Sequence, residues 1–117
     1  MSKKILVIDD DEDVLEIVAF ILEEKGHDIV KSLDGNILSQ IDIVRPDLII
    51  LDNTIGAISG SDLCRGLKST DSHKYIPVIL CSAADELRNI SKDCGADCYL
   101  PKPFNLDELD TAVSKMI

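Results

Sequence analysis

Short unbroken runs of apolar residues alternate along the chain with longer segments in which apolar residues recur every three or four positions. Four of the runs cover residues 5–8, 48–51, 78–81 and 98–101, and a further short strand is expected over residues 27–33. Runs of this length that are apolar on both faces are typical of strands buried inside a parallel sheet. The alternation therefore predicts an α/β protein in which strands and helices follow one another five times.

The segments between the strands carry helix signals. Apolar spacing predicts helices around residues 14–22, 37–44, 63–67, 85–93 and 106–116. Asn105, with Glu108 three residues later, predicts a capping box at the start of the last helix. The inner stripe of that helix is expected to contain Leu106, Leu109, Val113 and Met116. Residues 53–60 are rich in glycine and small side chains, so a loop is expected there.

The strand order follows from the hydrophobicity of the runs. Residues 5–8 and 48–51 are the most apolar, which favours central positions for the first and third strands. With right-handed crossovers this gives a doubly wound, five-stranded parallel sheet of order 2-1-3-4-5. In such sheets ligands bind outside the carboxyl ends of the strands, at the point where the order reverses. The first and third strands flank that point here.

Polar side chains follow four of the strands at this same edge. Asp9 and Asp10 follow the first strand, Asp52 the third, Ser82 the fourth and Lys102 the fifth. Crowded carboxylates repel one another, and a bound cation is one way to keep them ionised. Mg²⁺ is a hard cation held by one or two carboxylates, waters and a phosphate. A carboxylate that attacks a phosphoryl donor forms an acyl phosphate, whose charge an ammonium and a hydroxyl could offset.

Each of these residues alone has an ordinary explanation. Acids after a strand are common helix caps and turn residues, so residues 9–13 by themselves indicate a cap more than a metal site. Ser82 could be a simple strand-end hydroxyl, and Lys102 a solvated lysine. The functional interpretation is favoured because four separate strands deliver complementary groups at equivalent ends.

Composition limits the class of protein. Residues 1–117 have the size of one domain, and 12 basic against 22 acidic side chains give a net charge of −10. This charge argues against direct binding to nucleic acid or to an anionic membrane. No run approaches the roughly 18 apolar residues of a membrane span, and no signal peptide is recognised, so a cytoplasmic protein is expected. The cysteines are expected to be small buried thiols at Cys64, Cys81, Cys94 and Cys98.

The arrangement resembles the receiver domain of two-component response regulators over nearly the whole chain. The motifs that carry the resemblance are residues 5–11, 46–52, Gly60, 77–83 and 95–104. Each motif alone also occurs in other proteins, but their order and spacing together are specific to this family. The resemblance implies a flavodoxin-like fold and a phosphorylation-dependent signalling switch, with no enzymatic turnover of a substrate.

The resemblance also implies roles for individual residues. Asp52 is similar to the phosphoacceptor, and Asp9 and Asp10 to the acid pair that binds Mg²⁺ with Asp52. Thr54 corresponds to the residue that lends a backbone carbonyl to the ion. Lys102 corresponds to the ammonium, and the Lys102-Pro103 bond is expected to be cis.

Two further positions correspond to the switch residues of the family. Ser82 matches the hydroxyl switch and Tyr99 the aromatic switch. The implied phosphodonor is a histidine kinase or a histidine phosphotransfer protein. The implied output is a protein partner that reads the surface of the fourth helix, fifth strand and fifth helix, with phosphorylation-linked dimerisation as a further possibility.

Some positions depart from the family pattern or vary within it. The loop after the acceptor usually carries proline four residues on, where this chain has Gly56, and glycine widens the backbone choice that proline would narrow. In the family, the residues two past the acceptor and two past the hydroxyl switch line the path of the attacking water, and Thr54 and Ala84 match these positions. Neither side chain is well suited to hold a water in line with the phosphorus atom. Hydrolysis should therefore be slow, and a long-lived phospho-form is expected.

Two other functions are compatible with parts of the pattern. A phosphatase of the haloacid-dehalogenase type would use Asp9 as nucleophile with Asp11 two residues on. That class needs a cap or a longer core, and Asp13 stands where it has Thr or Val. The other alternative is a scaffold domain with a vestigial site.

Overall fold

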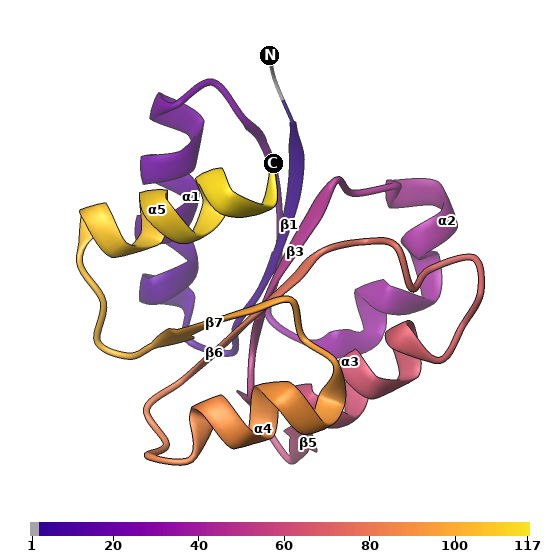
Figure 1. The fold of residues 1–117 in the computed structure, drawn as a ribbon. Helices are drawn as coiled ribbons and strands as arrows, with labels where there is room; N and C mark the ends of the chain where they lie inside the picture. The colour runs from indigo at the N-terminus through magenta and orange to yellow at the C-terminus, as the bar shows by residue number, and fades with distance from the viewer. Residues whose placement is uncertain (1–2) are drawn as a thin grey trace.

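The computed structural model describes residues 3–117 as a sheet with helices on both faces (Figure 1). The elements along the chain are β1 (Lys4–Ile8), α1 (Glu12–Glu24), β2 (Asp28–Ser32), η1 (Gly35–Gln40), α2 (Ile41–Val44), β3 (Leu48–Asp52), β4 (Thr54–Ile55), β5 (Ile58–Ser59), α3 (Gly60–Lys68), β6 (Val78–Ser82), α4 (Leu87–Cys94), β7 (Cys98–Pro101) and α5 (Leu106–Met116). None of the helices in the described range is long and apolar enough to cross a membrane.

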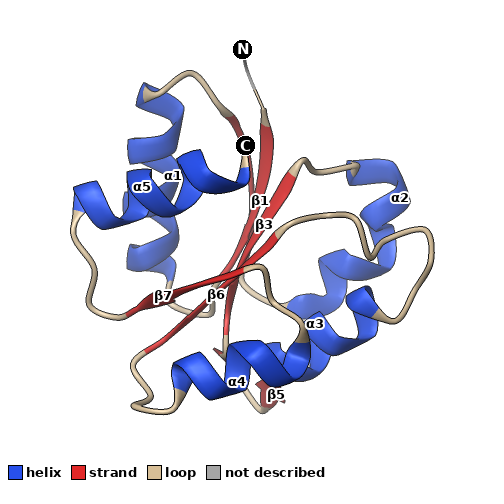
Figure 2. Ribbon diagram, viewed as in Figure 1, coloured by secondary structure: helices blue, strands red, loops and turns tan. Residues whose placement is uncertain are grey.

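The main sheet is parallel and has the order β2-β1-β3-β6-β7. Strands β6 and β7 are the fourth and fifth of the predicted strands, so the predicted order 2-1-3-4-5 is confirmed. Helices α1 and α5 cover one face, and α2, α3 and α4 cover the other (Figure 2). This is the doubly wound, flavodoxin-like arrangement, with its switch point between β1 and β3.

The sheet has a hydrophobic core on each of its faces, which explains why the central strands are apolar at every position. Ile5 and Val7 pack into the core beneath α1 and α5, whereas Leu6 and Ile8 pack into the core beneath α2, α3 and α4. All four side chains are at most 2% exposed. Since successive strand residues point to opposite faces, a sheet covered on both sides requires an unbroken apolar run.

Local capping fixes where the helices next to the sheet edge begin. Asp11 is the N-cap of α1, and its side chain accepts hydrogen bonds from the backbone N–H groups of Asp13 and Val14. The predicted capping box of α5 is confirmed, because Asn105 and Glu108 bond reciprocally. Asp11 therefore serves the helix, which leaves Asp9 and Asp10 as the polar groups of this loop nearest β3.

The second predicted helix was only partly right. Residues 35–40 form a 3₁₀ helix and only Ile41–Val44 is α-helical. Asp34 caps the 3₁₀ turn through the Asn36 N–H, and the Ser39 hydroxyl donates to the Asn36 carbonyl. Such short polar side chains compete with the helical hydrogen bonds of the backbone. The apolar spacing alone could not show this competition.

The loop predicted over residues 53–60 contains a small antiparallel hairpin. Strands β4 and β5 pair Thr54 with Ser59 and Ile55 with Ile58, around a two-residue turn. Ile55 is 3% exposed and anchors the hairpin in the core beneath α3. The region was expected to be irregular because its glycines and small side chains are typical of loops. The burial of Ile55 nevertheless holds it as a hairpin.

The predicted inner stripe of α5 was wrong at one position. Leu106 is 60% exposed, while Leu109, Ala112 and Val113 are buried. Leu106 is the first residue of the helix, and helical side chains lean toward the N-terminus, so this one projects past the sheet. The cysteines are free thiols as expected: Cys64, Cys81 and Cys94 are buried, and Cys98 is half-buried.

Candidate phosphoryl and metal site

Three carboxylates meet at the carboxyl edge of the sheet. Asp9 directly follows β1, Asp52 is the last residue of β3, and Asp10 lies beside them in the loop before α1. Each contributes a carboxylate oxygen to a group whose members all lie within 4.8 Å of one another. Asp9 and Asp52 are buried, with 4% and 7% exposure, whereas Asp10 is exposed. The structure thus brings together the acids that the sequence placed at this edge.

Backbone pairing holds Asp9 and Asp52 side by side. The register of β1 and β3 pairs Ile8 with Leu51, so the residues that follow emerge next to each other. The Asp9 N–H donates to the Ser32 carbonyl at 3.1 Å, and Asp9 Oδ1 accepts from the Asp11 N–H at 2.9 Å. The first bond fixes the Asp9 backbone, and the second fixes its carboxylate.

The chain after Asp52 turns sharply into the hairpin and α3. The Asn53 N–H donates to the Cys81 carbonyl, and the Gly60 N–H donates to the Asn53 carbonyl at 2.7 Å. A Cβ on residue 60 would collide with the Asp52 carbonyl oxygen and would lie 2.9 Å from Asn53 Cα. The close approach of α3 to the end of β3 therefore requires glycine at this position.

Lys102 reaches this group from the end of β7. Its Nζ lies 2.7 Å from Asp9 Oδ2 and 3.3 Å from Asp52 Oδ1. The Lys102 N–H donates to the Ser82 carbonyl at 2.9 Å, which continues the β6–β7 ladder to the base of the side chain. The Lys102-Pro103 peptide bond is cis, as the family resemblance implied. One ammonium thus bridges two buried carboxylates.

The electrostatics of this group follow from burial and charge. Burial raises the pKa of Asp52 above its usual value, and the Asp9 charge raises it further, against the opposing effect of Lys102. Burial acts to lower the pKa of the Lys102 ammonium, but its hydrogen bond to Asp9 and the charges of Asp52 and Asp9 raise it overall. Lys102 therefore stays protonated, and the acids still carry excess negative charge.

The remaining predicted residues lie around this group at different depths. Ser82, at the end of β6, is buried, and its Oγ accepts from the Ala84 N–H at 3.0 Å. Thr54 is exposed at the start of β4. Tyr99 lies on β7, is 41% exposed and lines a groove of about 350 Å³ with side chains of α5. Tyr99 is thus open to solvent at this groove.

One contact at the site was not predicted from the sequence. The backbone N–H of Gly56 donates to Asp10 Oδ2 at 2.8 Å. A backbone donor leaves no side-chain pattern, and the only signal was glycine at a position where proline is usual in the family. The hairpin therefore touches the acids directly.

The donor set suits Mg²⁺. The acids supply three carboxylate oxygens from two buried residues and one exposed residue, and hard oxygen ligands of this kind are those that Mg²⁺ prefers. Because Asp10 is exposed, the site opens to solvent on one side, where waters or a phosphoryl group could complete the coordination. Sulfur and imidazole ligands, which favour zinc, are not part of this group.

Comparisons with known proteins agree with this geometry. The family model described as "Response regulator receiver domain" matches residues 5–114. The chain is 39% identical over 112 residues to response regulator MprA of Mycobacterium bovis, which covers 93% of this chain and 48% of that protein. It is 32% identical over 120 residues to the alkaline phosphatase synthesis transcriptional regulatory protein PhoP of Bacillus subtilis, with 100% and 49% covered. The chain spans about half the length of these relatives.

A solved structure supports the same assignment. The signal receiver domain of a histidine kinase from Syntrophus aciditrophicus superposes with a TM-score of 0.89 at 32% identity, over 97% of this chain and 89% of that one. The chain therefore belongs to the receiver domains of two-component response regulators. Domains of this family are phosphorylation-dependent signalling switches that receive phosphoryl groups from histidine kinases, and they bind Mg²⁺ in an acidic pocket. The phosphatase and scaffold alternatives are not favoured.

Replacement of Asp52 by asparagine should stabilise the fold in Mg²⁺-free buffer at neutral pH. Because the folded-state pKa of Asp52 is raised, ionisation opposes folding, and this cost grows as pH rises from the ordinary value through the raised one. We expect Asp52→Asn to raise the midpoint of thermal unfolding by roughly 2–4 °C at pH 7, and by less near pH 4. Circular dichroism measures both midpoints.

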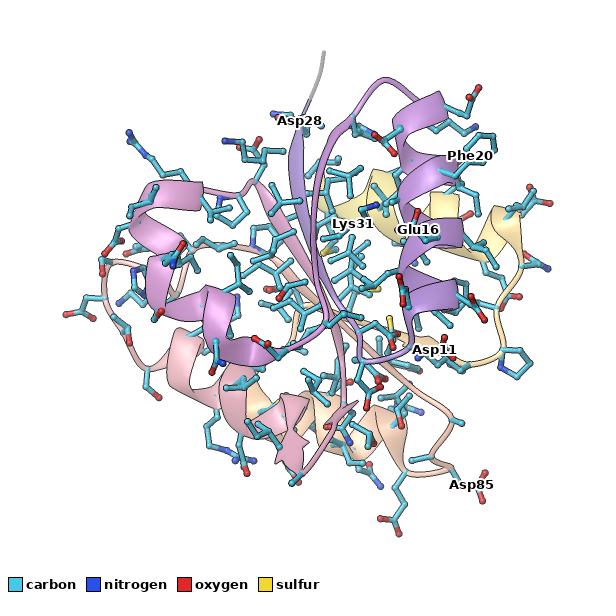
Figure 3. The ribbon with its side chains drawn as sticks, turned by 180° about the vertical axis from the view of Figure 1, so that it is seen from behind. Asp11, Glu16, Phe20, Asp28, Lys31 and Asp85 are labelled. Atoms are coloured by element: carbon cyan, nitrogen blue, oxygen red, sulfur yellow. The ribbon has the colours of Figure 1, made fainter. Side chains whose placement is uncertain are left out.

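The matched control is Asp85→Asn, which changes an exposed acid outside the group (Figure 3). A midpoint for Asp52→Asn that equals or falls below the wild-type value at pH 7 would contradict the electrostatic account.

Proposed function

We propose that Asp52 accepts a phosphoryl group from a histidine kinase or a histidine phosphotransfer protein. The observation that carries the proposal is the bridge from Lys102 to Asp9 and Asp52, within a cluster of three carboxylates. In the transfer, a carboxylate oxygen of Asp52 bonds to phosphorus as the bond from phosphorus to the donor's histidine nitrogen breaks. The product is an acyl phosphate. Each acceptor reacts once per signalling cycle, so the domain is a switch and not an enzyme.

The hydrogen bonds of the three acids support the choice of Asp52 as the nucleophile. Both oxygens of Asp9 are engaged, one by the Asp11 N–H and the other by Lys102. Asp10 is held by the Gly56 N–H. Within residues 3–117, Asp52 has only the longer 3.3 Å contact to Lys102, through one of its oxygens. Asp52 is therefore the acid best able to present an oxygen to phosphorus.

The other groups of the site have complementary roles in this proposal. Asp9, Asp10 and Asp52, with the backbone carbonyl of Thr54, would hold Mg²⁺. When bound, the ion supplies positive charge to the oxygens of the transferred group. Lys102 offsets charge on the same group, and the Ser82 hydroxyl, on the neighbouring strand end, donates a hydrogen bond to it. The free thiols fit a reducing compartment, and we place the protein in the cytoplasm.

The output surface in this proposal is formed by α4, β7 and α5. Ser82 would move toward the phosphoryl oxygens, and Tyr99 would turn inward from its half-exposed position. Tyr99 lines the groove between β7 and α5 with Asn105, Glu108, Thr111 and Lys115. Its movement would reshape that groove, which a downstream protein or a second copy of the chain would read.

The donor is proposed to dock at a second groove, which Lys102 lines. An apolar groove of about 380 Å³ runs between α1 and the segment after β7, with Val14, Ile17, Ala83, Lys102 and Phe104 along it. Ile17 and Phe20 of α1 are 60% and 63% exposed. Phe20 lies on the outer side of the helix (Figure 3). Because Lys102 belongs to both the groove and the acid group, a protein seated here would hold its phosphohistidine close to Asp52.

Phosphorylation should occur at Asp52 and require a divalent ion. Incubation with acetyl phosphate and Mg²⁺, followed by borohydride reduction and peptide mass spectrometry, should locate one phosphoryl group at Asp52. The label should disappear in Asp52→Asn and in the presence of a chelator. Amide NMR of the intact phosphorylated protein, before reduction, should show shifts in residues 83–104 as well as near Asp52. A label at Asp9, or repeated turnover of a phosphomonoester, would instead favour the phosphatase.

The docking surface is tested by Phe20→Ser. Loss of this exposed aromatic side chain, which a docked donor would bury, should lower by about tenfold the rate of transfer from a phosphorylated histidine domain that phosphorylates the wild-type chain. Phosphorylation by acetyl phosphate should not change, because the acids are untouched. The control is Ile43→Ser, an exposed apolar residue on α2 with 79% exposure. Equal transfer rates for Phe20→Ser and wild type would place the donor elsewhere.

The phospho-form should be long-lived. A threonine hydroxyl at position 54 and an alanine methyl at position 84 offer poor support for a water aligned with phosphorus. We expect the double variant Thr54→Asn, Ala84→Gln to lose phosphate several-fold faster at fixed Mg²⁺, as followed by release of labelled phosphate. Equal or slower decay in the double variant would show that these side chains do not limit hydrolysis.

A further inference from the structure

The Gly56 amide lies at the tip of the β4–β5 hairpin and contacts one acid of the site. Its N–H donates to Asp10 Oδ2 at 2.8 Å, across 46 positions of sequence. In the described part of the chain, this is the hydrogen bond that joins the hairpin to the loop between β1 and α1. The hairpin could therefore influence the acids without contributing a side chain to them.

The backbone conformation at this turn requires glycine. Gly56 has φ of 60°, while Ala57 keeps the negative φ usual for an L-residue. A two-residue hairpin turn with positive φ only at its first position has the character of a type II′ turn, which favours glycine there. A Cβ at residue 56 would meet no atom within 4 Å, so backbone conformation, not space, sets the requirement. Proline would remove the N–H donor and force a negative φ.

The hairpin is anchored firmly enough to hold the donor in place. Ile55 is buried in the core, and the strands on either side of the turn pair with each other. The base of the hairpin is closed by the bond from the Gly60 N–H to the Asn53 carbonyl, and by the bond from the Ser61 N–H to Asn53 Oδ1 at 2.9 Å. The position of the Gly56 N–H is thus fixed relative to the end of β3, where Asp52 lies.

We infer that Gly56 is a positioning residue for the metal site, whose amide sets the orientation of the Asp10 carboxylate before the ion arrives. This inference rests on the proposed function, because it assumes that Asp9, Asp10 and Asp52 bind Mg²⁺. Asp9 and Asp52 are buried and already fixed by Lys102. Asp10 is the exposed member of the group, so its placement depends most on a single hydrogen bond.

Two effects of this bond on metal affinity oppose each other. The amide draws negative charge from the carboxylate, which weakens its attraction for a cation. It also restricts an exposed side chain to one orientation and partly offsets its repulsion by the other acids, which lowers the cost of binding. An ionised carboxylate has about four acceptor sites, so one amide leaves most of its capacity for the ion. Orientation should therefore outweigh the loss of charge, and the bond should strengthen Mg²⁺ binding.

The sharpest test removes the N–H and keeps the rest of the residue. Replacement of Gly56 by glycolic acid turns the amide into an ester, and the full chain can be assembled by ligation of a synthetic segment at Cys64. The control is the same replacement of Ala57 by lactic acid, since the Ala57 N–H donates no hydrogen bond within residues 3–117. Isothermal calorimetry with Mg²⁺ should give about three- to tenfold weaker binding for the ester at 56 than for the ester at 57.

The kinetics of phosphorylation distinguish a positioning role of Gly56 from general damage to the fold. With acetyl phosphate, the ester at 56 should react more slowly than wild type at Mg²⁺ concentrations below saturation and equally fast at saturation. A variant with damaged structure would be slower at both. Replacement of Gly56 by D-alanine in the same synthetic segment, which keeps the N–H and adopts positive φ without strain, should bind Mg²⁺ close to wild type.

The outcomes distinguish this inference from the proposed function. If wild type binds Mg²⁺ and Asp10→Ala does not, the metal site stands, and equal or tighter binding by the ester at 56 overturns the role of Gly56 alone. If wild type itself shows no Mg²⁺ binding that depends on Asp10, the metal assignment in the proposed function fails as well.

Discussion

The bridge from Lys102 to Asp9 and Asp52 is the contact on which the site depends. Three carboxylates lie within 4.8 Å of one another, and two of them are buried, so their mutual repulsion would oppose folding without a nearby cation. The ammonium offsets part of this charge from 2.7 and 3.3 Å. The sheet order matters for this reason: β1 and β3 must be neighbours to bring the acids together, and β7 must lie on the same side to bring the lysine within reach.

The rest of the fold supports this edge at some cost to stability. The central strands bury apolar side chains on both faces, and this burial offsets the unfavourable charge at their ends. Burial and the Asp9 charge raise the pKa of Asp52 against the effect of Lys102, so the ammonium does not fully compensate this carboxylate. Strain of this kind is common where a site is arranged for a ligand. Here the excess negative charge would attract a divalent ion, and the positive charges of that ion and of Lys102 would then offset the charge of a phosphoryl group.

Much of the fold and the main acids were predictable from the sequence, for physical reasons. Unbroken runs such as residues 48–51 mark strands buried on both faces, and the carboxyl ends of parallel strands share one edge, so Asp9 and Asp52 were predicted to meet. The 3₁₀ helix before α2 was missed because Asn36 and Ser39 form local bonds that apolar spacing does not show. The hairpin and the bond from the Gly56 N–H to Asp10 were missed because a backbone donor has no signature in the order of side chains.

The most direct test of this account is the response of thermal stability to Mg²⁺. A ligand that binds only the folded state at ten times its Kd adds about 1.4 kcal/mol to the free energy of unfolding, which for a domain of this size raises the midpoint by roughly 5 °C. We expect such a rise for wild type with Mg²⁺, and none with NaCl at equal ionic strength. An equal shift with both salts, or no shift with Mg²⁺, would contradict the claim that these acids form a divalent-ion site.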